Sequence, residues 1–161
     1  MKTLQWLGAA VAALTLAGCT INAGSDTTTT PTTAITPTTQ SQNAALAAWI
    51  GAHASGLLQL GKDINQVQAG GNAANMTEIV KGCLALRSDA TKDASVAPIP
   101  DAQIEAHWSA ALTEYASGAK DCLAGFQQGN LGLVAQYKSY RNAANAQIGQ
   151  VAQELQQLAG G

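Results

Sequence analysis

The chain has 161 residues and a formal net charge of −2, and only 11% of its residues are charged. Typical domains contain about 25% charged residues. With no basic stripe and no polybasic segment, the composition argues against nucleic-acid binding and against docking on anionic lipid headgroups.

Residues 1–18 have the features of a lipoprotein signal peptide. Lys2 supplies a positive charge, and residues 4–17 are mostly apolar but fall short of the roughly 20 residues that span a bilayer. The sequence Leu-Ala-Gly-Cys at 16–19 resembles the lipobox of bacterial lipoproteins, which is an aliphatic residue, two small residues and a cysteine. The resemblance implies cleavage before Cys19 and lipidation of its thiol. An ordinary signal peptide cleaved near Ala17, with Cys19 unmodified, is the alternative.

Residues 19–43 are expected to be the lipidated N-terminus and a disordered linker. Thr and Pro dominate residues 27–39, where large apolar residues are almost absent. Such a segment buries too little surface to offset its chain entropy. Thr with Pro also resembles O-glycosylated stalks, and a bare linker is the other interpretation.

Residues 44–159 form the predicted domain, because apolar residues recur there at helical spacing. A first stripe runs from Leu46 to Val67 and stops at Gly70-Gly71, and a second helix begins near Asn75. Within the second helix, Glu78 stands at the position of a capping box.

The third helix is expected to begin at Asp101, a residue type that caps helices, after two prolines that end the second. Gly129-Asn130 separates it from a fourth stripe that reaches Leu158. No segment has the alternation of a strand. The sequence therefore predicts an all-α domain, an antiparallel up-down-up-down four-helix bundle.

The cysteine count is consistent with an exported chain. Of three cysteines, lipidation would use Cys19 and leave Cys83 and Cys122 on the apolar stripes of the second and third helices. In an oxidising compartment, a disulfide is the expected state of such a pair. Two free buried thiols are the alternative, and a metal site would need further ligands nearby.

The segment around Cys122 is also similar to secreted helical proteins of high-GC Gram-positive bacteria. The pattern consists of Pro98-Ile99-Pro100-Asp101, Trp108, Ala111-Leu112, Tyr115 and Asp121-Cys122. The resemblance implies a fold and a compartment, and it carries over no catalytic residue.

Two groups of side chains are candidate sites. His53, Tyr115 and Arg141 fall at one predicted layer of the bundle, as a buried polar network or as the lining of a pocket for an anionic ligand. Trp49, Trp108 and His107 fall near one end, either filling the core or forming an exposed patch for a partner.

No catalytic group, metal site or cofactor is expected. Neither His53 nor His107 has a carboxylate three or four residues away, and the carboxylates form no obvious pair. The sequence therefore favours a membrane-anchored lipoprotein on the extracytoplasmic face, with a non-enzymatic binding or structural role. A carrier of a small apolar or amphipathic ligand is the second hypothesis, and a hydrolase of unrecognised type is the third.

Overall fold

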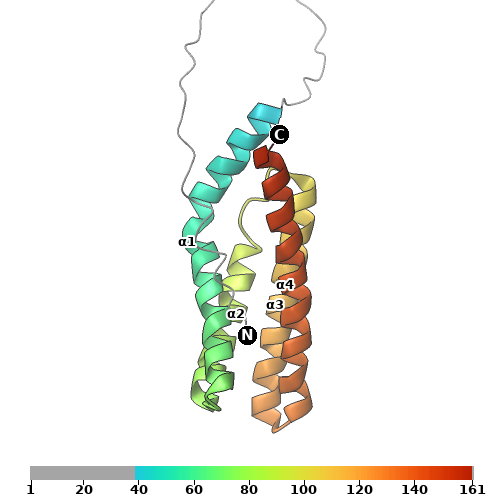
Figure 1. Ribbon diagram of the computed structural model, residues 1–161. Coiled ribbons are helices and arrows are strands. Elements are labelled where there is room, and N and C mark those ends of the chain that lie inside the picture. Colours follow the sequence, from blue (N-terminus) through green and yellow to red (C-terminus); the bar gives the residue numbers. More distant parts are fainter. Residues whose placement is uncertain (1–38, 161) are drawn as a thin grey trace, which may run out of the picture. The chain divides into compact units, whose positions relative to one another are not determined.

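The computed structural model describes residues 39–160, which are helical apart from short connections and contain no strand. The helices of this part of the chain are α1 (Thr39–Asn72), α2 (Met76–Asp93), α3 (Ala102–Gln128) and α4 (Leu131–Gly160) (Figure 1). The predicted all-α class and the four helices are therefore confirmed. The signal peptide, Cys19 and most of the predicted linker lie outside the described residues.

Short side chains and one glycine set several helix ends, as the sequence predicts. Asn75 Oδ1 accepts a hydrogen bond from the Glu78 backbone N–H at 3.2 Å, which caps α2. Asp101 caps α3 in the same way, because its carboxylate accepts from two N–H groups of the first turn. Gly129 ends α3 with a positive φ of 63°, a conformation that glycine adopts without steric cost.

Both ends of α1 differ from the prediction. It begins at Thr39, inside the stretch assigned to the linker, and Asn43 Nδ2 donates to the Leu158 carbonyl of α4 at 3.3 Å. The helix also continues through Gly70-Gly71 to Asn72. Glycine is tolerated there because it permits a close contact: a Cβ at Gly70 would lie 2.8 Å from the backbone N of Ile79.

Helices adjacent in sequence pack against each other: α1 on α2, α2 on α3, and most extensively α3 on α4. Glycines allow two of these contacts to be close. A Cβ at Gly82 of α2 would lie 2.9 Å from the backbone N of Val67 on α1, and one at Gly125 of α3 would lie 2.9 Å from that of Val134 on α4. Any larger residue would force the paired helices apart.

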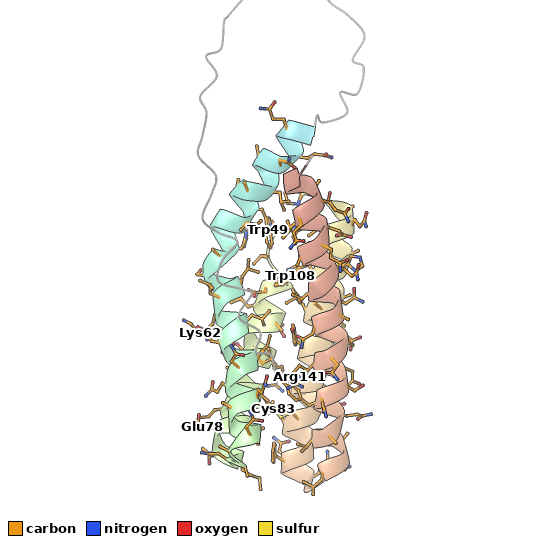
Figure 2. The ribbon with its side chains drawn as sticks, viewed as in Figure 1. Trp49, Lys62, Glu78, Cys83, Trp108 and Arg141 are labelled. Atoms are coloured by element: carbon orange, nitrogen blue, oxygen red, sulfur yellow. A yellow bond between two sulfur atoms is a disulfide. The ribbon has the colours of Figure 1, made fainter. Side chains whose placement is uncertain are left out.

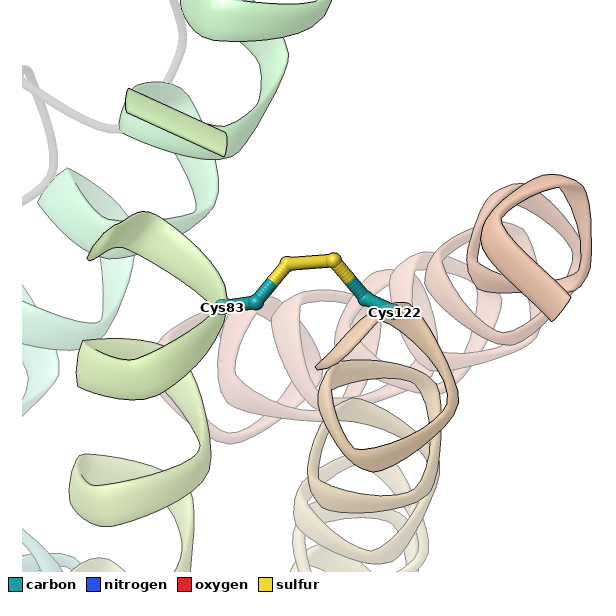
Figure 3. Close-up of a disulfide and its surroundings, with 2 residues drawn as sticks. All are labelled: Cys83 and Cys122. Atoms are coloured by element: carbon teal, nitrogen blue, oxygen red, sulfur yellow. A yellow bond between two sulfur atoms is a disulfide. The ribbon is translucent and has the colours of Figure 1, made fainter. Parts of the chain in front are cut away.

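The core combines small and aliphatic residues with buried aromatic rings. Its most completely buried large side chains include Leu86, Ile104 and Leu112. Within this core a disulfide joins Cys83 of α2 to Cys122 of α3, with the Cα atoms 6.4 Å apart (Figure 3). The predicted bridge is confirmed. Among the described helices, none has a stretch apolar and long enough to cross a bilayer.

Candidate functional site

A polar cluster lies in the contact between α3 and α4. Tyr115 is 2% exposed, and its hydroxyl donates to Asn145 Oδ1 at 2.7 Å. Tyr137 is also buried, and its hydroxyl has no hydrogen-bond partner in the described part of the chain. Burial raises the pKa of each phenol to about 12, and the positive charge of Arg141 opposes the shift in both.

Arg141 is the basic member of this cluster (Figure 2). Its Nε is buried without a hydrogen-bond partner, and neither of the ion pairs found in residues 39–160 includes it. The charge of Arg141 acts on the Tyr115 hydroxyl group and on that of a second phenol, Tyr137. Tyr137 stands four residues before Arg141 on the same apolar stripe, which is the signal that could have identified it.

His53 makes its contacts elsewhere. Its ring stacks on Trp49 with centroids 4.4 Å apart, and Nδ1 lies 2.8 Å from the Trp49 carbonyl oxygen. The charge of His53 acts on Asp93 of α2, and no described contact joins it to Tyr115 or Arg141. The described contacts of His53 are therefore with Trp49 and Asp93, and they do not include the other two members of the predicted layer.

Trp49, Trp108 and His107 had two interpretations, core filling or an exposed patch, and the burial of the two tryptophans does not fit an exposed patch. The two tryptophans, which are labelled in Figure 2, are only 8% and 7% exposed, and both line one small pocket. Trp49 Nε1 donates to the Ala97 carbonyl at 2.7 Å, which ties α1 to the connection before α3. The two rings therefore fill the core, which was the other interpretation of the pattern.

His107 faces α4 instead of a partner surface. Its Nδ1 lies 2.6 Å from Gln147 Oε1, and its Nε2 lies 3.4 Å from Glu154 Oε1. Both partners come from α4, at a spacing of seven residues that brings them to one face of that helix. His107 therefore links α3 to α4.

Two pockets described within residues 39–160 are small. One of about 10 Å³ is lined in part by Trp49, Trp108 and Asp93. Another of about 100 Å³ lies at the start of α3, lined by Asp101, Gln103, Ile104, Glu154, Gln157 and Leu158. Ligand pockets for small molecules usually have volumes of about 300–1,000 Å³. Neither pocket is lined by His53, Tyr115 or Arg141.

Three carboxylates that the sequence analysis left unpaired come together between α1 and α2. Asp63 of α1 is 2% exposed, and its Oδ1 accepts from Gln59 Nε2 at 2.9 Å. Asp89 of α2 lies within hydrogen-bonding range of the Asp63 carboxyl group. Burial, followed by this neighbouring carboxyl group, raises the pKa of Asp63 to about 6.

Asp93 extends the same group by one turn of α2. Its carboxylate packs on α1, because a Cβ at Gly56 would lie 2.8 Å from Asp93 Oδ1. Burial and then the charge of Asp89 raise the pKa of Asp93. The prediction that the carboxylates form no pair is therefore wrong here. Asp63 lies on the apolar stripe of α1, three residues after Leu60, and that position is the signal of its burial.

The side chains of the described residues do not assemble a metal-binding group: no three His, Cys, Asp or Glu residues of 39–160 are placed to hold an ion. Comparison of the chain with models of protein families, with curated proteins and with solved structures finds no match. The chemistry of the chain's own residues is therefore the basis for interpreting its function.

Proposed function

We propose that the chain is an exported bacterial lipoprotein with a non-enzymatic binding or structural role in the cell envelope. In this proposal Cys19 is lipidated after cleavage of residues 1–18, and the helical domain lies at the extracytoplasmic face of the cell membrane. The observation that carries the proposal is the Cys83–Cys122 disulfide. Such bridges persist in oxidising compartments and are rare in the cytosol.

The same bridge bears on the third cysteine. Of the three cysteines, two are joined to each other, and Cys19 is the one outside this bridge. It follows Leu-Ala-Gly directly, in the order of a lipobox. An odd thiol in an exported chain needs a separate explanation, and lipidation supplies one.

The proposal includes the arrangement of the domain on its tether. The connections at 73–75 and 129–130 are short, and short connections place consecutive helices antiparallel, as in an up-down-up-down bundle. The Thr- and Pro-rich segment that precedes α1 would serve as the linker. The bundle would then stand a short distance from the membrane surface.

Labelling with palmitate tests the anchor. The wild-type chain, expressed in a bacterium that processes lipoproteins, should incorporate the label, and Cys19→Ala should lose it. Asn22→Ala is the matched control, because it lies close to the same site and should keep the label. Incorporation by Cys19→Ala, or none by the wild type, would contradict the proposal.

A carrier function is the second candidate, and one observation favours it. Tyr137 Oη and Arg141 Nε are buried hydrogen-bonding groups without partners in the described structure, four residues apart on α4. An anionic group on an amphipathic ligand could accept from both. The small volumes of the two pockets, about 10 and 100 Å³, favour the first candidate over this one.

Native mass spectrometry separates these two candidates. A carrier purified from its host should retain a ligand mass that Arg141→Met loses while its thermal unfolding is unchanged. Lys138→Met, one turn earlier on an exposed position of α4, is the matched control and should retain the ligand. The absence of any ligand mass in the wild type would exclude the carrier.

A further inference from the structure

In the contact between α1 and α2, two carboxyl groups lie close together, and neither can donate a hydrogen bond to the other when both are ionised. Asp63 Oδ1 accepts from Gln59, whereas Asp63 Oδ2 is buried and has no partner in the described residues. The Asp89 carboxyl group lies within hydrogen-bonding range. Two ionised carboxylates only accept hydrogen bonds, so this pair has no donor unless one of them is protonated.

The groups around Asp63 favour protonation over ionisation. From α2, Asp89 and Asp93 both face it with negative charge, and from its own helix Gln59 is the neutral donor. Lys92 and then His53 oppose the rise in the pKa of Asp93, and neither acts on Asp63. Neither ion pair of residues 39–160 includes Asp63. Like charges in a buried site are relieved when one carboxyl group takes up a proton.

The position of the pair connects its protonation to the packing of α1. Asp63 and Asp89 face each other from opposite sides of the α1–α2 contact, and Asp93 packs against Gly56 nearby. The helix α2 is also tied to α3 by the disulfide, whereas the main packing partner of α1 is α2. Repulsion between the carboxylates should therefore displace α1, while the disulfide holds α2 to α3.

We propose that Asp63 carries a proton that it donates to Asp89, and that loss of this proton loosens α1 from α2, so that the attachment of α1 responds to pH. When the proton is present, one carboxyl group donates to the other and the contact is satisfied. When it is lost, the buried negative charge of Asp63 faces the half-buried carboxylates of Asp89 and Asp93. The inference does not depend on the lipid anchor, and each can fail without the other.

The direction of the pH dependence follows from linkage. A carboxyl group whose pKa is higher in the folded state than in the unfolded state binds its proton more tightly when folded. The pKa of Asp63 rises from 3.8 to about 6, so its stabilising contribution is complete below about pH 4 and is lost as the pH rises through about 6. Between about pH 5 and about pH 7, the protection of α1 should fall about tenfold.

Hydrogen exchange of the full chain tests this inference. Protection factors, corrected for intrinsic exchange, are measured for backbone amides of α1 and α3 at about pH 5 and about pH 7. In the wild type, α1 amides should lose about tenfold protection, and α3 amides should lose less. In Asp63→Asn, the amide group donates to Asp89 at every pH, so this dependence should disappear. Asp89→Asn should weaken the dependence without abolishing it, because burial, the largest cause of the raised pKa of Asp63, remains.

Asp121→Asn is the matched control, since it makes the same chemical change on α3 and should keep the wild-type dependence. Equal α1 protection at the two pH values in the wild type would overturn the inference. So would a dependence as large as that of the wild type in Asp63→Asn, or a loss in α3 as large as that in α1. If Asp63→Asn fails to fold, a dependence in Asp89→Asn that is weaker than in the wild type supports the inference, and an equal dependence overturns it.

Discussion

Cys83 of α2 and Cys122 of α3 are joined across the contact between these two helices, with Cα atoms 6.4 Å apart. The bridge connects a pair of helices on each side, because α1 packs on α2 and α4 packs on α3. The disulfide therefore joins the α1–α2 pair to the α3–α4 pair. The separation of 39 residues between the cysteines makes it a long-range constraint on the unfolded chain.

Removal of the bridge should destabilise the domain substantially. The chain-entropy model gives about 4 kcal/mol for a closed loop of this length. The double variant Cys83→Ala/Cys122→Ala should show this loss in denaturant unfolding, and reductant should lower the Tm of the wild type. Reductant should leave the Tm of the double variant unchanged. A wild-type Tm that is insensitive to reductant would contradict a stabilising disulfide.

The close approach of α1 and α2 depends on Gly82. An added Cβ would meet Val67 backbone N at 2.9 Å, so Gly82→Ala should cost about 1–3 kcal/mol by displacing the helices. Gly61→Ala is the control: no atom lies within 4 Å of its added Cβ, and alanine should stabilise α1 by up to about 1 kcal/mol. Urea unfolding of both variants measures the difference. A stability gain in Gly82→Ala would refute the close contact.

Two tyrosines in the α3–α4 contact should respond differently to loss of the hydroxyl group. Tyr115→Phe removes the 2.7 Å hydrogen bond to Asn145 and should cost about 1 kcal/mol. Tyr137→Phe removes a buried hydroxyl that has no partner in the described residues, so stability should stay the same or increase. Chemical denaturation of the two variants in parallel is the measurement. A larger loss of stability in Tyr137→Phe than in Tyr115→Phe would contradict the described hydrogen bonding of the two hydroxyl groups.

Ala74, in the connection between α1 and α2, has a φ of 52°. A left-handed conformation costs a residue with a Cβ roughly 1–2 kcal/mol, and glycine avoids this cost while adding entropy to the unfolded chain. Ala74→Gly should therefore raise the free energy of unfolding by about 0.5–1 kcal/mol. Ala73→Gly, which has no positive φ to relieve, should lower it. Destabilisation by Ala74→Gly would contradict the turn geometry.

Several helix ends were predictable because residues close in sequence determine them. Asn75 and Asp101 accept hydrogen bonds from N–H groups two or three residues further along, and Gly129 supplies a left-handed conformation at the helix end. Such contacts involve no distant part of the chain. The apolar stripes are equally local, which explains why the helical class could be predicted as well.

Other features depend on contacts between distant residues. The first turns of α1 are polar, and a tertiary hydrogen bond there joins Asn43 to Leu158, 115 residues away. Helix α1 passes through Gly70 because α2 packs closely there, so the glycine signal for a helix end was misleading. The positive φ falls on Ala74, a residue type with no preference for it.

The difference between local and long-range contacts also explains which members of the candidate site could be predicted from the sequence. Tyr115 and Arg141 belong to helices in extensive contact, so counting turns from their short connection brings them together. His53 belongs to α1, whose register is determined by its packing on α2, and there it stacks on Trp49. The acidic pair was missed because Asp63 and Asp89 become neighbours only when these two helices pack.

The mass of the N-terminal peptide of the mature protein, purified from bacterial membranes, tests the central claim most directly. Lipidation predicts a peptide that begins at Cys19 and carries a diacylglycerol group on its sulfur, with or without a further acyl chain on its amino group. A mature chain that begins at another residue, or one that begins at Cys19 with an unmodified thiol, would contradict the proposed anchor.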